Sequence, residues 1–195
     1  MQYDFFNAPA AAVPQPPITL REHASSDYGP RTGENARGAD VTVAFATDFS
    51  TAGERLTERV AGRRKYVGIA YGSDIEKAAD ELAQFMAASG AKTLNVAGNG
   101  IYTLTRQGIT QAMADRWVYE VLKRVHERIG LTAIRSGGQT GVDTSGLVAG
   151  MALGIPVTGL YPKGFRRRLE NNRDVTSDEQ TLLAELKAAA QALRG

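Results

Sequence analysis

The sequence predicts an α/β domain built on a mainly parallel, doubly wound sheet with helices on both faces. Short runs of apolar, often β-branched residues alternate along the chain with segments of helical period. The helical segments are long enough to carry the chain back across a sheet, and such crossovers join parallel strands with a right-handed turn. A length of 195 residues, 43% of them hydrophobic, suits one globular domain with an appendage.

Residues 1–40 are expected to form a flexible, proline-rich N-terminal arm. Five of the seven prolines fall in this segment, which shows no apolar period. A loosely ordered terminus is the favoured interpretation, and the alternative is that Tyr3, Phe5 and Phe6 dock the arm on a neighbouring subunit or another protein. The Rossmann-like ligand-binding domain is then expected to span residues 41–195.

The elements of that domain follow in order from residue 41. Strands are predicted at residues 41–46, 65–71, 92–98, 131–136 and 155–161. Capping boxes, in which Ser or Thr is followed three residues later by Glu, predict helices that start at Thr51, Ser73 and Thr176. Apolar stripes and small residues predict further helices at about 110–128 and at 143–153, with loops at residues 99–108 and 162–174.

In a Rossmann-like sheet, ligands bind beyond the carboxyl ends of the strands, where the connecting loops converge. The search for a site therefore narrows to the loops at residues 47–52, 71–74, 97–108, 136–144 and 161–175.

The composition excludes several functional classes. The chain has no cysteine and only two histidines, so disulfides, Cys-based zinc sites and a Ser-His-Asp triad are not expected, and no metal site is predicted. It has no run of about 18 apolar residues that would span a bilayer. The first residues also lack the basic start and apolar stretch of a secretory signal. These features predict a cytoplasmic protein with no membrane partner.

The most informative segment is Ser136-Gly-Gly-Gln-Thr-Gly-Val-Asp143, which joins a predicted strand to a predicted helix. Gly137, Gly138 and Gly141 let the backbone turn tightly and leave its N–H groups open to a ligand. The helix that begins near Asp143 adds the positive end of its dipole. The pattern favours a bound phosphate or another oxyanion. The alternative is a sharp turn followed by a helix that Asp143 caps.

Other side chains near this segment are candidates for the same ligand. Ser136, Gln139 and Thr140 offer hydrogen bonds, Lys163 offers a positive charge, and Gly164 permits close approach of the backbone.

A second group of candidates lies in the loop at residues 97–108. Asn99 is expected to bind a base or a ribose hydroxyl, and Tyr102 to stack on a base or close the pocket. The alternative is an Asn-Gly turn with Tyr102 packed over the sheet. Asp48, after the first strand, is a third candidate, either as an acceptor for a ribose hydroxyl or as a helix-entry residue.

Arg166, Arg167 and Arg168 form the obvious basic cluster, which suits the distal phosphate of a ligand or a nucleic-acid backbone. Acidic residues follow closely, so nucleic acid is not expected as the primary partner.

Ser136–Asp143, followed by Ala152-Leu-Gly-Ile-Pro156 and Pro162-Lys-Gly164, resembles the molybdenum-carrier family. That family belongs to a superfamily of Rossmann-like nucleotide-binding proteins that includes the DNA-processing proteins and the Lonely Guy phosphoribohydrolases. The resemblance implies a pocket for a nucleotide or nucleotide-derived ligand, with a molybdenum species as a further candidate, and it implies a homo-oligomer. In the relatives this segment usually opens the domain. Here it follows about 130 residues, so the earlier part is either rearranged or a distinctive version of the fold.

Three functions follow from these residues. The leading hypothesis is a sensor, carrier or sequestering protein that binds a phosphorylated, nucleotide-derived small molecule through the Ser136–Asp143 loop. The second is an N-glycosidic or phosphoribosyl hydrolase in which Asp143 is the catalytic carboxylate, assisted by Asp48 or Glu54. Against the second, the Lonely Guy motif P-G-G-x-G-T-x-x-E differs in order from S-G-G-Q-T-G-V-D. The third is an interaction protein whose proline-rich arm binds the partner.

Overall fold

The computed structural model describes residues 17–195, whose strands pair as one six-stranded parallel sheet and one two-stranded antiparallel sheet. The strands are β1 (Ile18–Glu22), β2 (Val41–Ala46), β3 (Tyr66–Ala70), β4 (Thr93–Gly98), β5 (Ala133–Ser136), β6 (Val157–Tyr161), β7 (Arg167–Arg168) and β8 (Asp174–Val175). The helices are α1 (Tyr28–Arg37), α2 (Ala52–Ala61), α3 (Ile75–Ser89), α4 (Ile101–Thr105), α5 (Gln111–Ile129), α6 (Val142–Leu153) and α7 (Glu179–Arg194).

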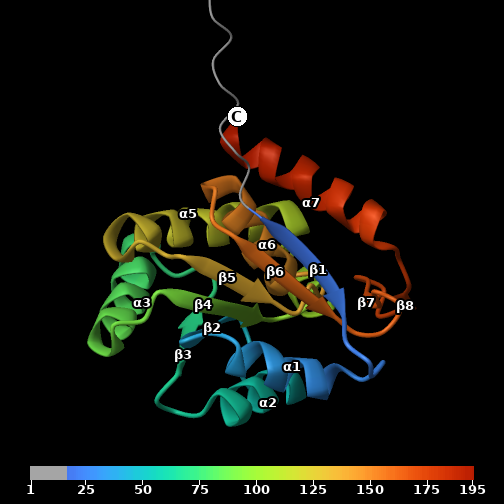
Figure 1. Cartoon of the computed structure of the whole chain (residues 1–195), viewed down its shortest axis with the longest axis horizontal. Helices are drawn as coiled ribbons and strands as arrows, with labels where there is room; N and C mark the ends of the chain where they lie inside the picture. The colour runs from blue at the N-terminus through green and yellow to red at the C-terminus, as the bar shows by residue number, and fades with distance from the viewer. Residues whose placement is uncertain (1–16) are drawn as a thin grey trace, which may run out of the picture.

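The large sheet has the order β1-β6-β5-β4-β2-β3 with every neighbouring pair parallel. Helices α1 and α2 pack together on one face, and α3, α5, α6 and α7 form the layer on the other (Figure 1). Because both faces are covered, β2 is buried along its whole length. The predicted fold class, a doubly wound parallel sheet between helices, is confirmed.

The arm predicted for residues 1–40 is wrong from Ile18 onward. Residues 18–22 form β1, which pairs with β6 at the edge of the sheet, and residues 28–37 form α1. Glycines at positions 29 and 33 and a proline at 30 obscured this helix, but a proline is tolerated in the first helical turn. The sheet domain therefore begins before residue 41. Residues 1–16, with Tyr3, Phe5 and Phe6, lie outside the described residues.

Smaller corrections concern caps and loops. The caps of α3 and α7 are Asp74 and Asp178, each of which accepts a hydrogen bond from the N–H three residues later, so Ser73 and Thr176 are not the caps. The predicted loop at 99–108 contains the short helix α4, and the predicted loop at 162–174 carries β7 and the start of its partner β8. These short elements lie beside the carboxyl edge of the sheet, where the site is found.

Candidate functional site

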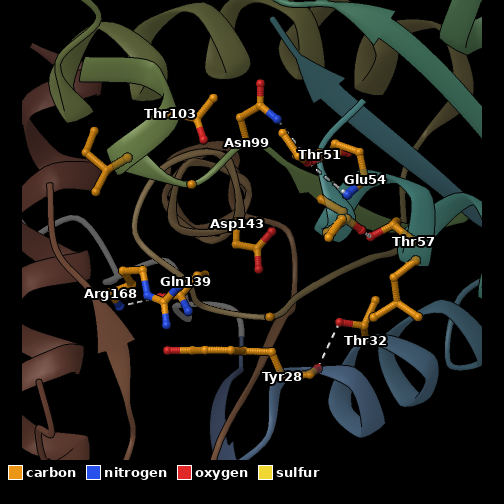
Figure 2. A pocket seen from close by; sticks show the side chains of 18 of the residues that line it. Tyr28, Thr32, Thr51, Glu54, Thr57, Asn99, Thr103, Gln139, Asp143 and Arg168 are labelled. Carbon is orange, nitrogen blue, oxygen red and sulfur yellow. Dashed lines mark hydrogen bonds between the residues drawn. The ribbon is translucent and has the colours of Figure 1, made fainter. Parts of the chain in front are cut away.

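A cleft of about 470 Å³ opens at the carboxyl edge of the sheet, between α1 and α2 on one side and the loops after β4 and β5 on the other. Its size is typical of a small-molecule site. Figure 2 shows Asp143 in the middle of the cleft, with Arg168 and Tyr28 toward one end and Glu54 and Asn99 toward the other. Four of the five expected loops contribute to the wall, and the loop at residues 71–74 does not.

Helix α1 supplies a polar stripe to the cleft that sequence analysis missed. Tyr28, Arg31, Thr32 and Asn35 all line it, at the i, i+3, i+4 and i+7 positions of one helical face. Asn35 is only 2% exposed, and neither polar atom of its amide has a hydrogen-bond partner among residues 17–195. The polar residues at helical spacing were the sequence signal for α1. This signal is easily overlooked because amphipathic helices are usually recognised by an apolar stripe.

Asp143 lies in the first turn of α6 and forms a buried ion pair with Arg31 of α1, with Nη1 and Oδ2 3.3 Å apart. The side chains are 12% and 6% exposed, respectively. Burial raises the pKa of Asp143, while the charge and hydrogen bond of Arg31 and the backbone N–H of Gln139 oppose that rise. The N-cap of α6 is Gly141, so the alternative in which Asp143 only caps this helix is wrong, and the Asp143 side chain pairs with Arg31.

Glu54 is the second carboxyl group in the cleft. Thr51 caps α2 as predicted, by accepting from the backbone N–H of Glu54. The Glu54 side chain turns into the cleft, where its Oε1 accepts a hydrogen bond from Asn99 Nδ2 at 3.3 Å. Burial, followed by the nearby charge of Asp143, raises the pKa of Glu54 to about 8. At neutral pH this side chain is mainly a neutral acid that can donate a hydrogen bond.

Asn99 holds the loop after β2 in place. Its Oδ1 accepts from the backbone N–H groups of Thr47 and Asp48 at 2.8 and 3.0 Å, and its Nδ2 donates to the Asp48 carbonyl. Asn99 lines the cleft as expected for a ligand-binding residue, yet its amide is already engaged within the protein. The geometry makes it the residue that orients Glu54.

The predicted glycine loop reaches the cleft through Gly137 and Gln139. A Cβ at Gly137 would lie 1.4 Å from Arg31 Nη1 and 2.4 Å from Asp143 Oδ2, so only glycine allows this pair to lie across the loop. Ser136 is fully buried and its hydroxyl donates to the Val96 carbonyl, which ties β5 to β4.

Gln139 and Thr140 fasten the loop to β7. The backbone N–H of Arg168 donates to Gln139 Oε1 at 2.6 Å, and the Thr140 hydroxyl donates to the Arg168 carbonyl. Gln111 fixes the backbone of Gly141: its Oε1 accepts from the Gly141 N–H, and its Nε2 donates to the Gly141 carbonyl. These residues position Arg168, which lines the cleft.

The remaining candidates are dispersed. Tyr102 lines the mouth of the cleft and is 37% exposed. Lys163 is exposed and its backbone bonds to Ser25, and Gly164 packs near Thr176, so neither lies in the cleft wall. Asp48 also lies outside the cleft wall. Its carboxylate accepts hydrogen bonds from the backbone N–H and hydroxyl of Ser50, which lower the pKa of Asp48.

Gly138 does not line the cleft. Close packing against Tyr161 requires a glycine at this position. Its φ is +66°, and a Cβ there would lie 2.2 Å from the ring of the buried Tyr161. Gly138→Ala is expected to lower the free energy of unfolding by about 2–4 kcal/mol, from backbone strain and overpacking together. Gly90 has the same φ with open space around it, so Gly90→Ala should lose only about 1–2 kcal/mol. Urea unfolding measures both, and equal losses would contradict the contact with Tyr161.

Among residues 17–195, no helix is long and apolar enough to cross a membrane. The same residues hold no group of three or more His, Cys, Asp or Glu side chains placed to bind a metal ion.

A model of the circularly permutated YpsA SLOG family matches residues 7–122 and 134–192. The chain belongs to this family. The SLOG match supports the Rossmann-like superfamily indicated by the Ser136–Asp143 segment, while the narrower resemblance to molybdenum carriers stays a prediction. A search of curated proteins finds no match.

A circular permutation fits the topology of this SLOG chain. Strands β5 and β6 come late in the sequence and β1 comes first, yet β5, β6 and β1 lie side by side in that order. Reading from β5 through β6 to β1 gives the 1-2-3 strand order of the first half of a Rossmann fold. Of the two alternatives, a rearranged or a distinctive fold, the family description supports rearrangement.

Proposed function

We propose that this SLOG protein binds a phosphorylated, nucleotide-derived small molecule in the cleft beside the Ser136–Asp143 loop, as a sensor, carrier or sequestering protein. The observation that carries the proposal is the cleft itself, which lies where ligands bind in doubly wound folds and is lined by polar side chains from α1 and α2. A cytoplasmic location and a homo-oligomeric state stay predictions.

Unpaired polar atoms in the wall support a polar ligand. The amide of Asn35, Glu54 Oε2 and Arg31 Nε are buried and have no hydrogen-bond partner among residues 17–195. Each buried, unsatisfied group destabilises a folded protein by about 1–3 kcal/mol. Three such groups around one cavity are typical of a site whose partner is supplied from outside.

The test is a binding panel with a variant that fills the cleft. Gly53 lines the cleft, and a Cβ there would meet only the Thr51 hydroxyl at 4.0 Å, so Gly53→Trp should place its ring in the cleft without disturbing the fold. Calorimetry with the four ribonucleoside 5′-monophosphates should show at least one ligand whose affinity falls tenfold or more in this variant. Glu58→Trp, on an exposed position of the same helix, should bind normally.

Two outcomes would contradict the proposal: no phosphorylated compound binds the wild-type protein, or Gly53→Trp binds as tightly as Glu58→Trp. Molybdate belongs in the panel as the oxyanion that the molybdenum-carrier resemblance implies. If molybdate binds and no nucleotide does, the proposed ligand would be molybdate and not a nucleotide.

A hydrolase is the second candidate, and the pair of carboxyl groups favours it. Glu54 is mainly protonated at neutral pH and could serve as a general acid, while Asp143, held by Arg31, is the catalytic carboxylate of the hydrolase hypothesis. Chromatography of the protein–nucleotide mixtures from the binding panel, with detection of released free base, distinguishes a hydrolase from a binding protein. Release of base that Glu54→Gln abolishes while ligand binding persists would establish turnover.

A further inference from the structure

The ligand's phosphate has two candidate places in the cleft, the glycine loop at the start of α6 and the arginines near β7. At the glycine loop, the protein's own ion pair between Arg31 and Asp143 already fills the space. The Asp143 carboxylate pairs with Arg31, and both side chains cover Gly137. A phosphate approaching this loop would meet a buried carboxylate at close range, which is unfavourable.

The second place combines cationic groups with an aromatic ring. The guanidinium carbons of Arg31, Arg166 and Arg168 lie 5.5, 5.0 and 5.5 Å from the centre of the Tyr28 ring. Arg168 and Tyr28 line the cleft, and Figure 2 shows them close together at one end of it. Arg166 does not line the cleft and acts there only through its charge.

This cluster carries an excess of positive charge. Arg31 is neutralised by Asp143, but Arg166 and Arg168 share the single carboxylate of Asp174, at 3.6 and 2.9 Å. The Tyr28 hydroxyl also donates to Asp174, whose carboxylate thus already accepts three hydrogen bonds within the protein. Arg166 Nε is buried and has no hydrogen-bond partner among the residues described. Three arginines and two carboxylates leave the cluster with one net positive charge, which favours an anion at this end of the cleft.

We infer that Arg168 and Tyr28 form the phosphate-binding end of the cleft, and that the glycine loop supports this site by positioning Arg168 and does not bind the phosphate itself. The inference rests on the proposed function. Gln139 and Thr140 hold the backbone of Arg168 from both sides, so the loop fixes the base of the guanidinium that meets the ligand. The phosphate group then lies across the cleft from Glu54 and Asn99, which face the rest of the ligand.

The experiment compares ligands with and without phosphate. For the 5′-monophosphate that binds best to wild type, Arg168→Gln should weaken binding about 10- to 100-fold, as expected for loss of a charge-assisted hydrogen bond. The matching nucleoside, which lacks the phosphate, should bind both proteins equally. Arg166→Gln should have a smaller effect that disappears at high salt, because it acts through charge alone. Arg173→Gln, an exposed arginine on the same hairpin, is the matched control.

The outcomes separate this inference from the proposed function. If the monophosphate binds wild type and Arg168→Gln equally well, the phosphate lies elsewhere and the inference is wrong while the proposed function stands. Equal losses for nucleoside and monophosphate would also overturn it, because Arg168 would then shape the cleft without contacting phosphate. If wild type binds no compound, the proposed function fails as well.

Discussion

Arg31→Met is expected to lower the free energy of unfolding at pH 7 by about 3–5 kcal/mol, the usual effect of removing one partner from a buried ion pair. Met retains much of the apolar volume of the side chain, so the loss comes mainly from the Asp143 carboxylate that stays buried without its partner. Such a loss is a large part of the 5–15 kcal/mol that stabilises a typical domain. Urea unfolding followed by circular dichroism measures it.

Two controls isolate the buried charge. Arg31→Met combined with Asp143→Asn removes both charges and should recover most of the loss, since an apolar or neutral replacement of the whole pair is often well tolerated. Arg124→Met removes a more exposed arginine that pairs with Glu76 and Glu120, and it should lose only about 1 kcal/mol. A double variant no more stable than the single one would show that Arg31 acts through packing.

The strands were predictable because their signal is local. The run from Val41 to Ala46 is apolar and β-branched, and all six of its residues are buried, as the sequence pattern requires for a strand covered on both faces. The convergence of the loops after β4 and β5 on one cleft followed from topology alone, because parallel strands end at the same edge.

The site was only partly predictable because its key contacts join distant segments. Arg31 and Asp143 are 112 residues apart in sequence, and nothing near either one indicates the other. Arg31 also lay in a segment whose glycines and proline suggested a linker. The stripe on α1 is polar because it faces the cleft, so the apolar period that reveals most helices is absent.

Glu54 shows how a correct local interpretation can hide a functional one. Thr51 and Glu54 match a capping box, and the Thr51 half of that motif is present. Whether the glutamate returns to the helix terminus or turns toward the cleft depends on Asn99, 45 residues away. Similarly, the sequence offers Gln139 and Thr140 as ligand contacts but does not reveal that the Gln139 amide and the Thr140 hydroxyl bond to β7.

Glu54→Gln is expected to stabilise the protein above about pH 5 and to have little effect near pH 4. The pKa of Glu54 is about 8 in the folded protein and 4.5 as its ordinary value, so between these pH values the folded state keeps a proton that the unfolded state releases. Stability of the wild type therefore falls as the pH rises from 4.5 to 8. Above pH 8, ionisation of Glu54 lowers the free energy of unfolding of the wild type by its full amount, about 3–5 kcal/mol.

The glutamine variant is neutral at every pH and can still accept the hydrogen bond from Asn99, so it removes the penalty without breaking that contact. Unfolding by urea at pH 4, 6, 7 and 8.5 should show wild type and variant diverging steadily, with the variant more stable. Glu58→Gln, on an exposed position of the same helix, should follow the wild type throughout. Parallel curves for wild type and Glu54→Gln would mean that Glu54 ionises normally, and the cleft would then carry a second negative charge that opposes a phosphorylated ligand.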